Sequence, residues 1–195
     1  MFNIMLDKLP TEYEGYRINT DFQIGIQITQ LMGDTDLSKD ERLSYALFLL
    51  FPTTDEAGNE LNIPDIDTAV EGLEWFMHGW IHDNLPKDQK KQAVTDFDID
   101  QWRLYAAFRA QYGINLNTAS LHFWEFMALL QNLEECAYTR VIDIRNKSEN
   151  PKMSAEEKTA LRKAKKIYAL SRVEKDLTEE QAEAIEKFRN MVKNG

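Results

Sequence analysis

The sequence predicts a mainly α-helical protein, a multi-helix bundle with a small N-terminal β-hairpin and a helical C-terminal extension. Apolar residues recur at the three- and four-residue spacing of amphipathic helices through most of the chain. Several of these stretches start after a residue that can cap a helix and end at Gly or Pro. Residues 11–18 instead place a Glu-Gly pair between two short extended pieces, as a hairpin does.

The chain has the size and composition of one globular unit with an appendage. Its 195 residues can bury a sizeable core, and 43% of them are hydrophobic while 29% are charged. The clearest linker is the polar stretch NKSENPK at residues 146–152. We therefore predict a helical core domain with the hairpin at residues 1–147. A basic helix and a terminal helix, at residues 148–195, are appended to it.

The charge distribution argues against a nucleic-acid partner. The formal net charge is -10, whereas duplex binding depends largely on Lys and Arg that neutralise phosphates. Residues 151–195 nevertheless contain 11 Lys and Arg against 8 Asp and Glu, so a mildly basic tail follows an acidic body. This tail is able to meet the body or a protein partner.

The sequence also predicts a cytoplasmic protein that has no membrane partner. No apolar run approaches the roughly 18 residues that suggest a membrane span, and Asp7 and Lys8 interrupt the N-terminal stretch before a secretory core develops. Cys136 is the single cysteine, so neither an intrachain disulfide nor a cysteine-rich zinc site can form. A reducing compartment suits this composition.

Two helices are predicted between the hairpin and the first long loop. Thr20 is expected to cap a helix that ends at Gly33 in a left-handed conformation. Ser38 and Glu41 have the spacing of a capping box, which starts a second helix that Pro52 ends. The last part of this second helix, LSYALFLLF, is apolar on nearly every side, so we expect it to be buried.

The next predicted helix, at residues 67–82, is amphipathic. One of its faces is apolar and the opposite face is acidic and histidine-rich. The apolar residues are Val70, Leu73, Phe76, Met77 and Trp80. The polar residues are Glu71, Glu74, His78 and His82.

The densest apolar and aromatic region, residues 101–133, predicts two helices joined by a short turn. The first helix ends at Gly113, and Thr118 is expected to cap the second. Few polar residues occur in the second helix, so it should be enclosed on most sides, with Trp124 and Phe126 in the core. It is the predicted central core helix.

Three further helices complete the predicted bundle. One covers residues 135–144 and is expected to turn Arg140 and Arg145 outward. Ser154 then opens a basic helix whose early acidic and later basic residues suit the helix dipole. A last helix with a modest apolar stripe is predicted at residues 178–192.

The polar face of the helix at residues 67–82 is the most metal-like pattern. Carboxylate and imidazole groups three or four residues apart on a helix can surround one Zn²⁺. The spacing is not that of the HExxH motif, however, and Glu-His pairs are common on solvated helix faces. We therefore predict no metal, with Glu74, His78 and His82 as the nearest candidates.

Two other polar groups have both a chemical and a structural interpretation. His122 and Glu125 have the spacing of an acid/base pair, or they form a polar stripe inside a bundle. Asp96, Asp98 and Asp100 resemble the start of a calcium loop, but the Gly and Glu that such a loop requires are missing. A helix N-terminal cap explains these three residues better. We predict no catalytic residue and no cofactor.

Two surfaces are candidates for contact with a protein partner or with a second copy of the chain. The first central helix carries an aromatic stripe beside alanines that let another backbone approach closely. The basic helix has few interleaved aromatic residues, which favours a solvated face or an acidic protein surface over RNA. The predicted partner-binding residues are Trp102, Tyr105, Arg109, Arg162, Lys163 and Lys166.

The order of several short stretches resembles that of a known family. These stretches are INTDF at 18–22, AAFRAQYGINL at 106–116, LHFWEFMALLQNL at 121–133, VIDIRN at 141–146 and KKIYAL at 165–170. Together they resemble the gene-product-fifteen family of siphophages and prophages of Gram-positive bacteria, over roughly residues 8–170. The resemblance implies a protein of the phage tail module and assigns no catalytic residue.

This resemblance leads to three functional hypotheses. The first is a non-enzymatic tail-assembly factor, a chaperone that binds the tape-measure protein in the cytoplasm of the bacterial host, with or without forming a homo-oligomer. The second is a structural component of the phage tail or of the head-tail junction. The third is an enzyme of unknown type. An acidic helical body with grooves suits the first, because it could shield the apolar stripes of a tape-measure protein.

Overall fold

The computed structural model describes residues 2–79 and 94–170 of the chain. Within these ranges it contains seven helices and one two-stranded antiparallel hairpin, which confirms the predicted mainly α-helical class. The terminal helix predicted at residues 178–192 lies outside the described residues. The elements are β1 (Glu12–Tyr13), β2 (Tyr16–Arg17), α1 (Phe22–Gly33), α2 (Lys39–Leu50), α3 (Ile66–His78), α4 (Phe97–Tyr112), α5 (Phe123–Gln131), α6 (Ala137–Asn146) and α7 (Ala155–Ile167).

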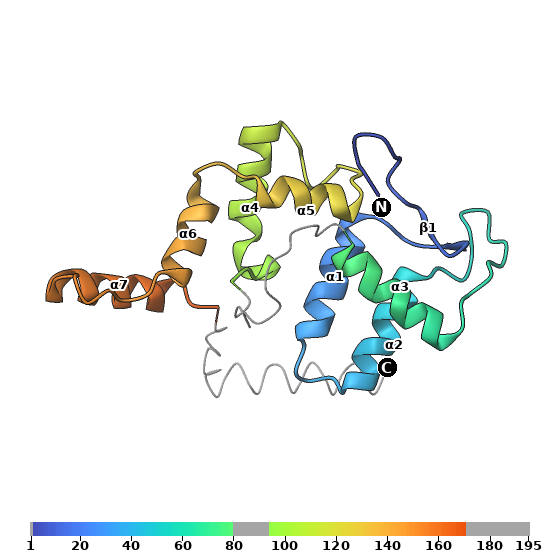
Figure 1. Ribbon diagram of the computed structural model, residues 1–195, viewed down its shortest axis with the longest axis horizontal. Coiled ribbons are helices and arrows are strands. Elements are labelled where there is room, and N and C mark those ends of the chain that lie inside the picture. The colour runs from blue at the N-terminus through green and yellow to red at the C-terminus, as the bar shows by residue number, and fades with distance from the viewer. Residues whose placement is uncertain (1, 80–93, 171–195) are drawn as a thin grey trace, which may run out of the picture.

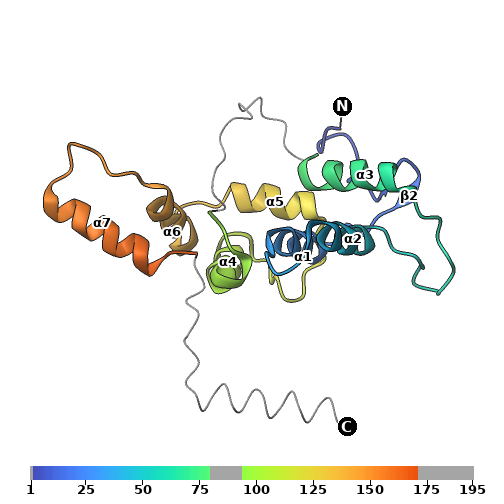
Figure 2. The ribbon, with the colours of Figure 1, turned by 90° about the horizontal axis from the view of Figure 1, so that it is seen from below.

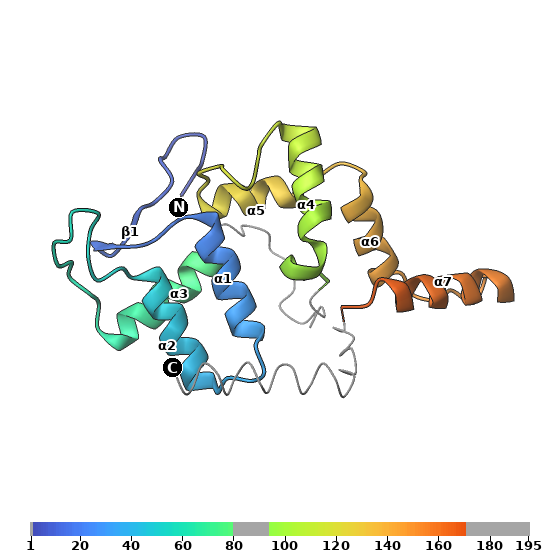
Figure 3. The ribbon, with the colours of Figure 1, turned by 180° about the vertical axis from the view of Figure 1, so that it is seen from behind.

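The first five helices form two layers, and the last two helices extend from one end. In Figure 2, α3 and α5 lie along one side of the molecule, while α1, α2 and α4 lie along the other and are seen nearly end-on. Figure 1, and Figure 3 from behind, show α1, α2 and α3 at one end, α4 and α5 in the middle, and α6 and α7 at the other end. α7 packs against α6, which itself packs against α4.

The hairpin forms where it was predicted and packs on α3. Glu14 and Gly15 have φ angles of 49° and 83°, the positive values that a tight two-residue hairpin turn requires. The ring centroid of Tyr13 lies 5.1 Å from that of Trp75 in α3. Such short strands are marginal alone, so contacts of this kind hold the hairpin on the helices.

α5 is the central core helix, as predicted, and both Trp124 and Phe126 are buried. The ring of Phe126 lies between two rings from other helices. It stacks on Phe22 of α1 at a centroid distance of 5.0 Å and on Phe108 of α4 at 5.2 Å. One side chain therefore joins three helices, and each aromatic pair of this kind contributes about 0.5–1.5 kcal/mol beyond the burial of its area.

α5 also holds α3 and approaches α1 closely. The indole N–H of Trp124 donates to the backbone oxygen of Phe76 in α3 at 2.7 Å, and the rings of Phe76 and Phe123 lie 5.2 Å apart. On the other side, a Cβ added to Gly25 of α1 would overlap the Phe123 ring. The close contact between α1 and α5 therefore requires the missing side chain of glycine.

The starts of α1 and α5 are fixed to each other by two backbone hydrogen bonds. The N–H of Phe22 donates to the oxygen of Leu121 at 3.0 Å, and the N–H of Phe123 donates to the oxygen of Thr20 at 2.8 Å. This antiparallel bridge satisfies one of the unpaired N–H groups at each helix start. The two helices consequently begin at the same point in space.

Three of the predicted helix ends are wrong, and this bridge explains the two that are helix starts. Asp21 caps α1 in place of Thr20, and His122 caps α5 in place of Thr118. The bridge uses the Thr20 carbonyl and keeps the chain extended up to His122, so both helices begin later than predicted. Gly33 is the last residue of α1 and does not adopt the predicted left-handed conformation.

α2 begins at the predicted capping box of Ser38 and Glu41. Ala46 and Leu50 are buried, but the Phe48 side chain is 70% exposed. The prediction that this whole apolar end is buried is therefore wrong. α2 makes its main helix contacts with α1 and α3, so the remaining side of the helix faces solvent.

α3 follows its predicted amphipathic pattern with one exception. Leu73 and Phe76 are buried as expected, whereas Val70 is exposed. The buried face of α3 is centred on Leu73 and Phe76, and Val70 lies at its edge. The helix ends at His78, and the predicted core residue Trp80 lies outside the described residues.

A buried ion pair joins α4 to α6. Asp100 is fully buried, and the side chain of Arg145 is only 8% exposed. The Nη1 and Nη2 atoms of Arg145 donate to the two carboxylate oxygens of Asp100 at 2.6 and 3.0 Å. Arg103 donates to the same carboxylate at 3.1 Å. The prediction that Arg145 faces outward is therefore wrong.

Arg145 is also bonded to two backbone oxygens, which explains how its charge is tolerated inside the protein. Its Nη1 donates to the oxygen of Val94 and its Nε to the oxygen of Tyr168, both at 2.7 Å. It thus connects α6 with the residues before α4 and after α7. α7 itself starts after Ser154, as predicted, and Ser154 forms a capping box with Glu157.

Replacing Phe126 with Ala is expected to lower the free energy of unfolding by about 3–5 kcal/mol, because the change removes both ring contacts and leaves a cavity. Phe48→Ala is the matched control, since it deletes the same atoms at an exposed position, and we expect it to cost less than about 1 kcal/mol. Urea denaturation followed by circular dichroism measures both values. Similar losses in the two variants would contradict the core assigned to α5.

Replacing Arg145 with Met is expected to cost about 3 kcal/mol, because the Asp100 carboxylate stays buried without its main partner. The double variant Asp100→Asn/Arg145→Met should lose less than Arg145→Met alone, since it leaves no buried charge. Arg140→Met on the same helix is the control. Its ion pair with Glu135 is exposed, so we expect a loss below about 1 kcal/mol. Denaturant titrations of the wild type and the three variants measure these losses. Equal losses of the free energy of unfolding in Arg145→Met and Arg140→Met would contradict the structural role of the pair of Asp100 and Arg145.

Candidate functional site

A largely apolar groove lies between α1 and α4. It encloses about 560 Å³. α1 and α4 form its walls, a loop after α4 borders it, and Phe126 of α5 contributes to its floor. The groove is lined by Phe22, Ile26, Gln30, Phe97, Asp98, Gln101, Trp102, Leu104, Tyr105, Leu116, Asn117 and Phe126.

Trp102 and Tyr105, two of the predicted partner-binding residues, are in the wall of this groove. The Trp102 side chain is 76% exposed. This is unusual for the largest apolar side chain, because most of the described aromatic residues are buried or half-buried. Its ring lies 6.2 Å from that of Tyr105 in an edge-to-face arrangement. Tryptophan and tyrosine in the wall of an accessible groove are typical of protein interfaces.

Arg109, the third predicted residue of α4, lies outside the groove lining. Its spacing of four residues from Tyr105 keeps it on the same side of the helix. The Nη1 atom of Arg109 donates to the oxygen of Gly113 at 3.2 Å, beyond the end of α4. Gly113 has a φ of 70°, so α4 ends in the predicted left-handed conformation. Arg109 thus contributes to the helix end.

An acidic hollow continues the groove past the end of α1. It shares Gln30, Phe97 and Asp98 with the groove. The amide of Gln30 donates to Asp98 at 2.7 Å at this junction. The hollow adds the carboxylates of Asp34, Asp36 and Asp96, and Leu170 lines its far side. None of its twelve lining residues, all within the described ranges, is Lys or Arg.

The basic residues predicted to bind a partner lie on α7, away from this groove. Figures 1 and 2 show α6 between α4 and α7. Lys163 and Lys166 are exposed. Arg162 makes a two-pronged contact with Glu149, at 2.6 and 2.9 Å, and this contact lowers the pKa of the Glu149 carboxyl. The structure therefore separates the six predicted residues into two surfaces.

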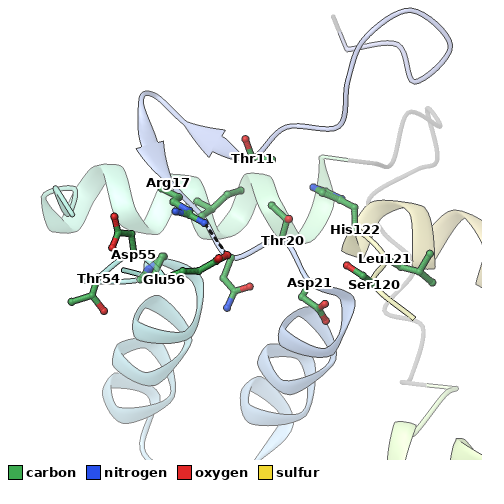
Figure 4. A pocket seen from close by; sticks show the side chains of 13 residues that line it. Thr11, Arg17, Thr20, Asp21, Thr54, Asp55, Glu56, Ser120, Leu121 and His122 are labelled. Carbon is green, nitrogen blue, oxygen red and sulfur yellow. Dashed lines mark ion pairs between the residues drawn. The ribbon is translucent and has the colours of Figure 1, made fainter. Parts of the chain in front are cut away.

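A polar hollow of about 400 Å³ lies where the hairpin, the start of α1, the loop after α2 and the start of α5 meet (Figure 4). Arg17 and Glu56 face each other across it at 3.9 Å. Asp55 accepts bonds from the side chain and backbone of Asn59, which lower the pKa of its carboxyl. Asp21 caps α1. These polar groups are engaged in holding loops and helix starts.

His122, predicted as either an acid/base residue or a structural one, has both ring nitrogens in use. Its Nδ1 accepts the backbone N–H of Trp124 at 3.0 Å, and its Nε2 therefore carries the proton and lies 3.0 Å from the oxygen of Pro10. Burial lowers the pKa of the imidazole below its ordinary value. These contacts favour the structural role, since His122 ties the chain before the hairpin to the start of α5.

The described residues do not assemble a metal site. Within residues 2–79 and 94–170, no group of three or more His, Cys, Asp or Glu side chains is placed to hold an ion. Glu74 and His78 lie one turn apart on exposed positions of α3, and the Nδ1 of His78 is 3.1 Å from the Glu74 backbone oxygen. His82, the third candidate, lies outside the described residues.

The three aspartates that resemble a calcium loop do different things. Asp96 caps α4 by accepting the N–H groups of Asp98 and Ile99 at 2.8 and 2.9 Å. Asp98 accepts the amide of Gln30, and Asp100 points inward to Arg145. The cap interpretation is confirmed for Asp96. Asp100 also takes part in the cap, since its carboxylate accepts the backbone N–H of Asp96 at 3.3 Å, and its shorter contacts are with Arg145 of α6.

The groove itself was missed at the sequence level. Trp102 and Tyr105 gave a local signal, since they are large aromatic residues on one face of a helix. The opposite wall, with Ile26 and Gln30, gave none. Sequence spacing cannot show that α1 and α4 lie on either side of α5.

Comparison with known proteins gives one family match. A family model described as Bacteriophage Gp15 protein matches residues 5–170, which include the hairpin and all seven helices of the described ranges. No curated protein and no solved structure matches the chain. Within residues 2–79 and 94–170, no helix has both the length and the apolar character needed to cross a membrane.

Replacing His122 with Asn is expected to weaken the dependence of stability on pH between about pH 7.5 and 5.5. The folded pKa of His122 is lowered, so the unfolded chain binds the proton first and stability is lost as the pH falls below the ordinary histidine value. Asn can still cap α5 but does not titrate. The measurement is the urea midpoint of both proteins across this range. His78→Asn, at an exposed position, is the control. An identical pH dependence in wild type and His122→Asn would show that His122 is not the group responsible.

Proposed function

Because the chain belongs to the bacteriophage Gp15 family, we propose that it is a phage tail-assembly factor, and specifically a chaperone that binds the tape-measure protein during tail morphogenesis. Family membership indicates a phage structural or assembly protein. The tape-measure partner follows from the tail-module resemblance. A chaperone of this kind is not an enzyme and acts in the cytoplasm of the bacterial host.

The observation that supports this proposal most strongly is the groove between α1 and α4. A largely apolar groove of about 560 Å³ with an exposed Trp102 in its wall is a surface suited to another protein. A tape-measure protein with long apolar stripes would aggregate if those stripes stayed in water. A groove of this kind covers apolar residues without requiring a reaction centre.

A second candidate function, a structural component that stays in the tail or in the head-tail junction, is favoured by α7. This helix extends from the body beside α6 (Figures 1 and 3). Its last residue, Ile167, is exposed next to exposed basic residues. An extended helix with an apolar residue and positive charge is suited to contact a neighbouring subunit. Mass spectrometry of purified virions separates the two functions, since a chaperone should be absent or nearly absent from them.

Coexpression with the tape-measure protein of the same phage is expected to raise the soluble fraction of that protein and to let the two copurify. Trp102→Ala should lower both the soluble fraction of the tape-measure protein and the amount that copurifies several-fold, because the exposed anchor of the groove is removed. Phe48→Ala is the control, since it truncates another exposed aromatic side chain away from the groove. If the tape-measure protein were equally soluble without this chain and never copurified with it, the chaperone function would be wrong.

A further inference from the structure

Along its two helical walls, the groove between α1 and α4 offers side chains to an occupant in place of free backbone. Both walls are α-helices whose N–H and C=O groups are paired within the helix. The amide of Gln30 is already bonded to Asp98, and the amide of Gln101 to the backbone oxygen of Asp98. An extended peptide placed here would bury unpaired backbone groups, whereas a helix satisfies its own. The groove therefore fits a helix.

The lining also defines what the occupying helix must present. Ile26, Trp102, Tyr105 and Leu116 make most of the accessible lining apolar. An occupying helix can match this surface with apolar residues repeated at spacings of three and four, which place one apolar stripe along the groove. Trp102 is the natural anchor because it contributes the largest exposed apolar surface in the groove wall.

The negative charge at one end of the groove favours one orientation of the bound helix. The adjoining hollow carries Asp34, Asp36, Asp96 and Asp98. The opposite end is bordered by the neutral residues Leu116 and Asn117. A helix that lies in the groove would meet this acidic hollow at one end only, so positive charge at that end is favoured.

The same charge argues against a symmetric pairing of two copies through this face. A two-fold pairing through this face would place the acidic hollow of one copy against either the hollow or the neutral end of the other. Among the described residues, neither the groove nor the hollow is lined by Lys or Arg, so neither pairing supplies positive charge. Like charges that meet in an interface cost free energy. The occupant that fits both the apolar groove and the acidic hollow is a different helix, one that is basic.

We propose that the groove between α1 and α4 binds an amphipathic α-helix of a partner protein, with an apolar stripe against Trp102 and Tyr105 and Lys or Arg over Asp34 and Asp36. This inference deepens the proposed function and rests on it only for the identification of the partner as the tape-measure protein. The groove is then the binding site, and the basic end of the helix sets the direction in which it lies.

Three fluorescein-labelled peptides of about 20 residues test this site with the full-length protein. The first has a Leu stripe at helical spacing and Lys at both ends. The second has the same stripe and Glu at both ends, and the third has the Lys ends but scattered Leu positions. Fluorescence anisotropy should give a dissociation constant at least about 10-fold lower for the first peptide than for either of the others. In high salt, the dissociation constants of the Lys and Glu peptides should move closer together, because salt screens the charges.

Two variants assign the binding to the groove and to its charge. Trp102→Ala should raise the dissociation constant of the Lys peptide by about 10-fold or more, whereas the control Phe48→Ala should change it less than about 2-fold. Asp34→Asn/Asp36→Asn should bring the Lys and Glu peptides to within about 3-fold of each other. Equal binding of all three peptides, or no effect of Trp102→Ala, would overturn the proposal.

Photocrosslinking identifies the occupant directly. A benzoylphenylalanine placed at Asn117, which lines the groove and is exposed, should crosslink to the Lys peptide and not to the scattered one. Crosslinks to residues 80–93 or 171–195 of the same chain, or to a second copy, would show another occupant and overturn the proposal.

The outcomes separate this site from the proposed function. If the Lys peptide binds but the tape-measure protein gains no solubility, the groove is retained and the partner is wrong. If the tape-measure protein is solubilised equally by wild type and Trp102→Ala, the function is retained and this site is wrong.

Discussion

The position of the Phe126 ring between Phe22 and Phe108 determines the arrangement of the other helices. Because this ring separates the two others, α1 and α4 pack on α5 and leave a groove between them. The same ring contributes to the floor of that groove. The core and the candidate site therefore depend on one interaction. A smaller side chain at position 126 would let α1 and α4 move together, so its effect on partner binding is inseparable from its effect on stability.

The buried pair of Asp100 and Arg145 fixes the rotation of α4 about its own axis. Asp100 points to α6, while Leu104 and Phe108 continue the buried side of the helix. At about 100° per residue, Trp102 is turned roughly 200° from Asp100, so it faces away from α6. A salt bridge replaced by apolar residues can be as stable. Here, however, a two-pronged contact orients the groove wall as well as holding the helices together.

Local chemistry accounts for what the sequence could predict. The hairpin turn at Glu14 and Gly15 and the capping box at Ser38 depend on residues within four positions of one another, so they are visible in the chain. Phe48 and Arg145 depend on distant neighbours. In its local pattern, an exposed apolar residue such as Phe48 looks the same as a buried one. A buried Arg145, whose partner Asp100 is 45 positions away, likewise looks the same as an exposed arginine. The groove belongs to this second class, because its walls come from helices some 70 residues apart and only α5 brings them together.

The size of the groove constrains how the proposed chaperone would work. A cavity of about 560 Å³ is in the range of sites for single small ligands, about 300–1,000 Å³, so it accommodates the side chains of a few helical turns. One copy could not shield a long tape-measure chain, and several copies would have to bind along it. Each copy would then bind with modest affinity, because a small contact area leaves little favourable free energy after the entropic cost of association. Modest binding would suit the proposed chaperone, because a chaperone has to release the protein that it shields. A permanent structural component would instead need a larger interface, to which the exposed surface of α7 would have to contribute.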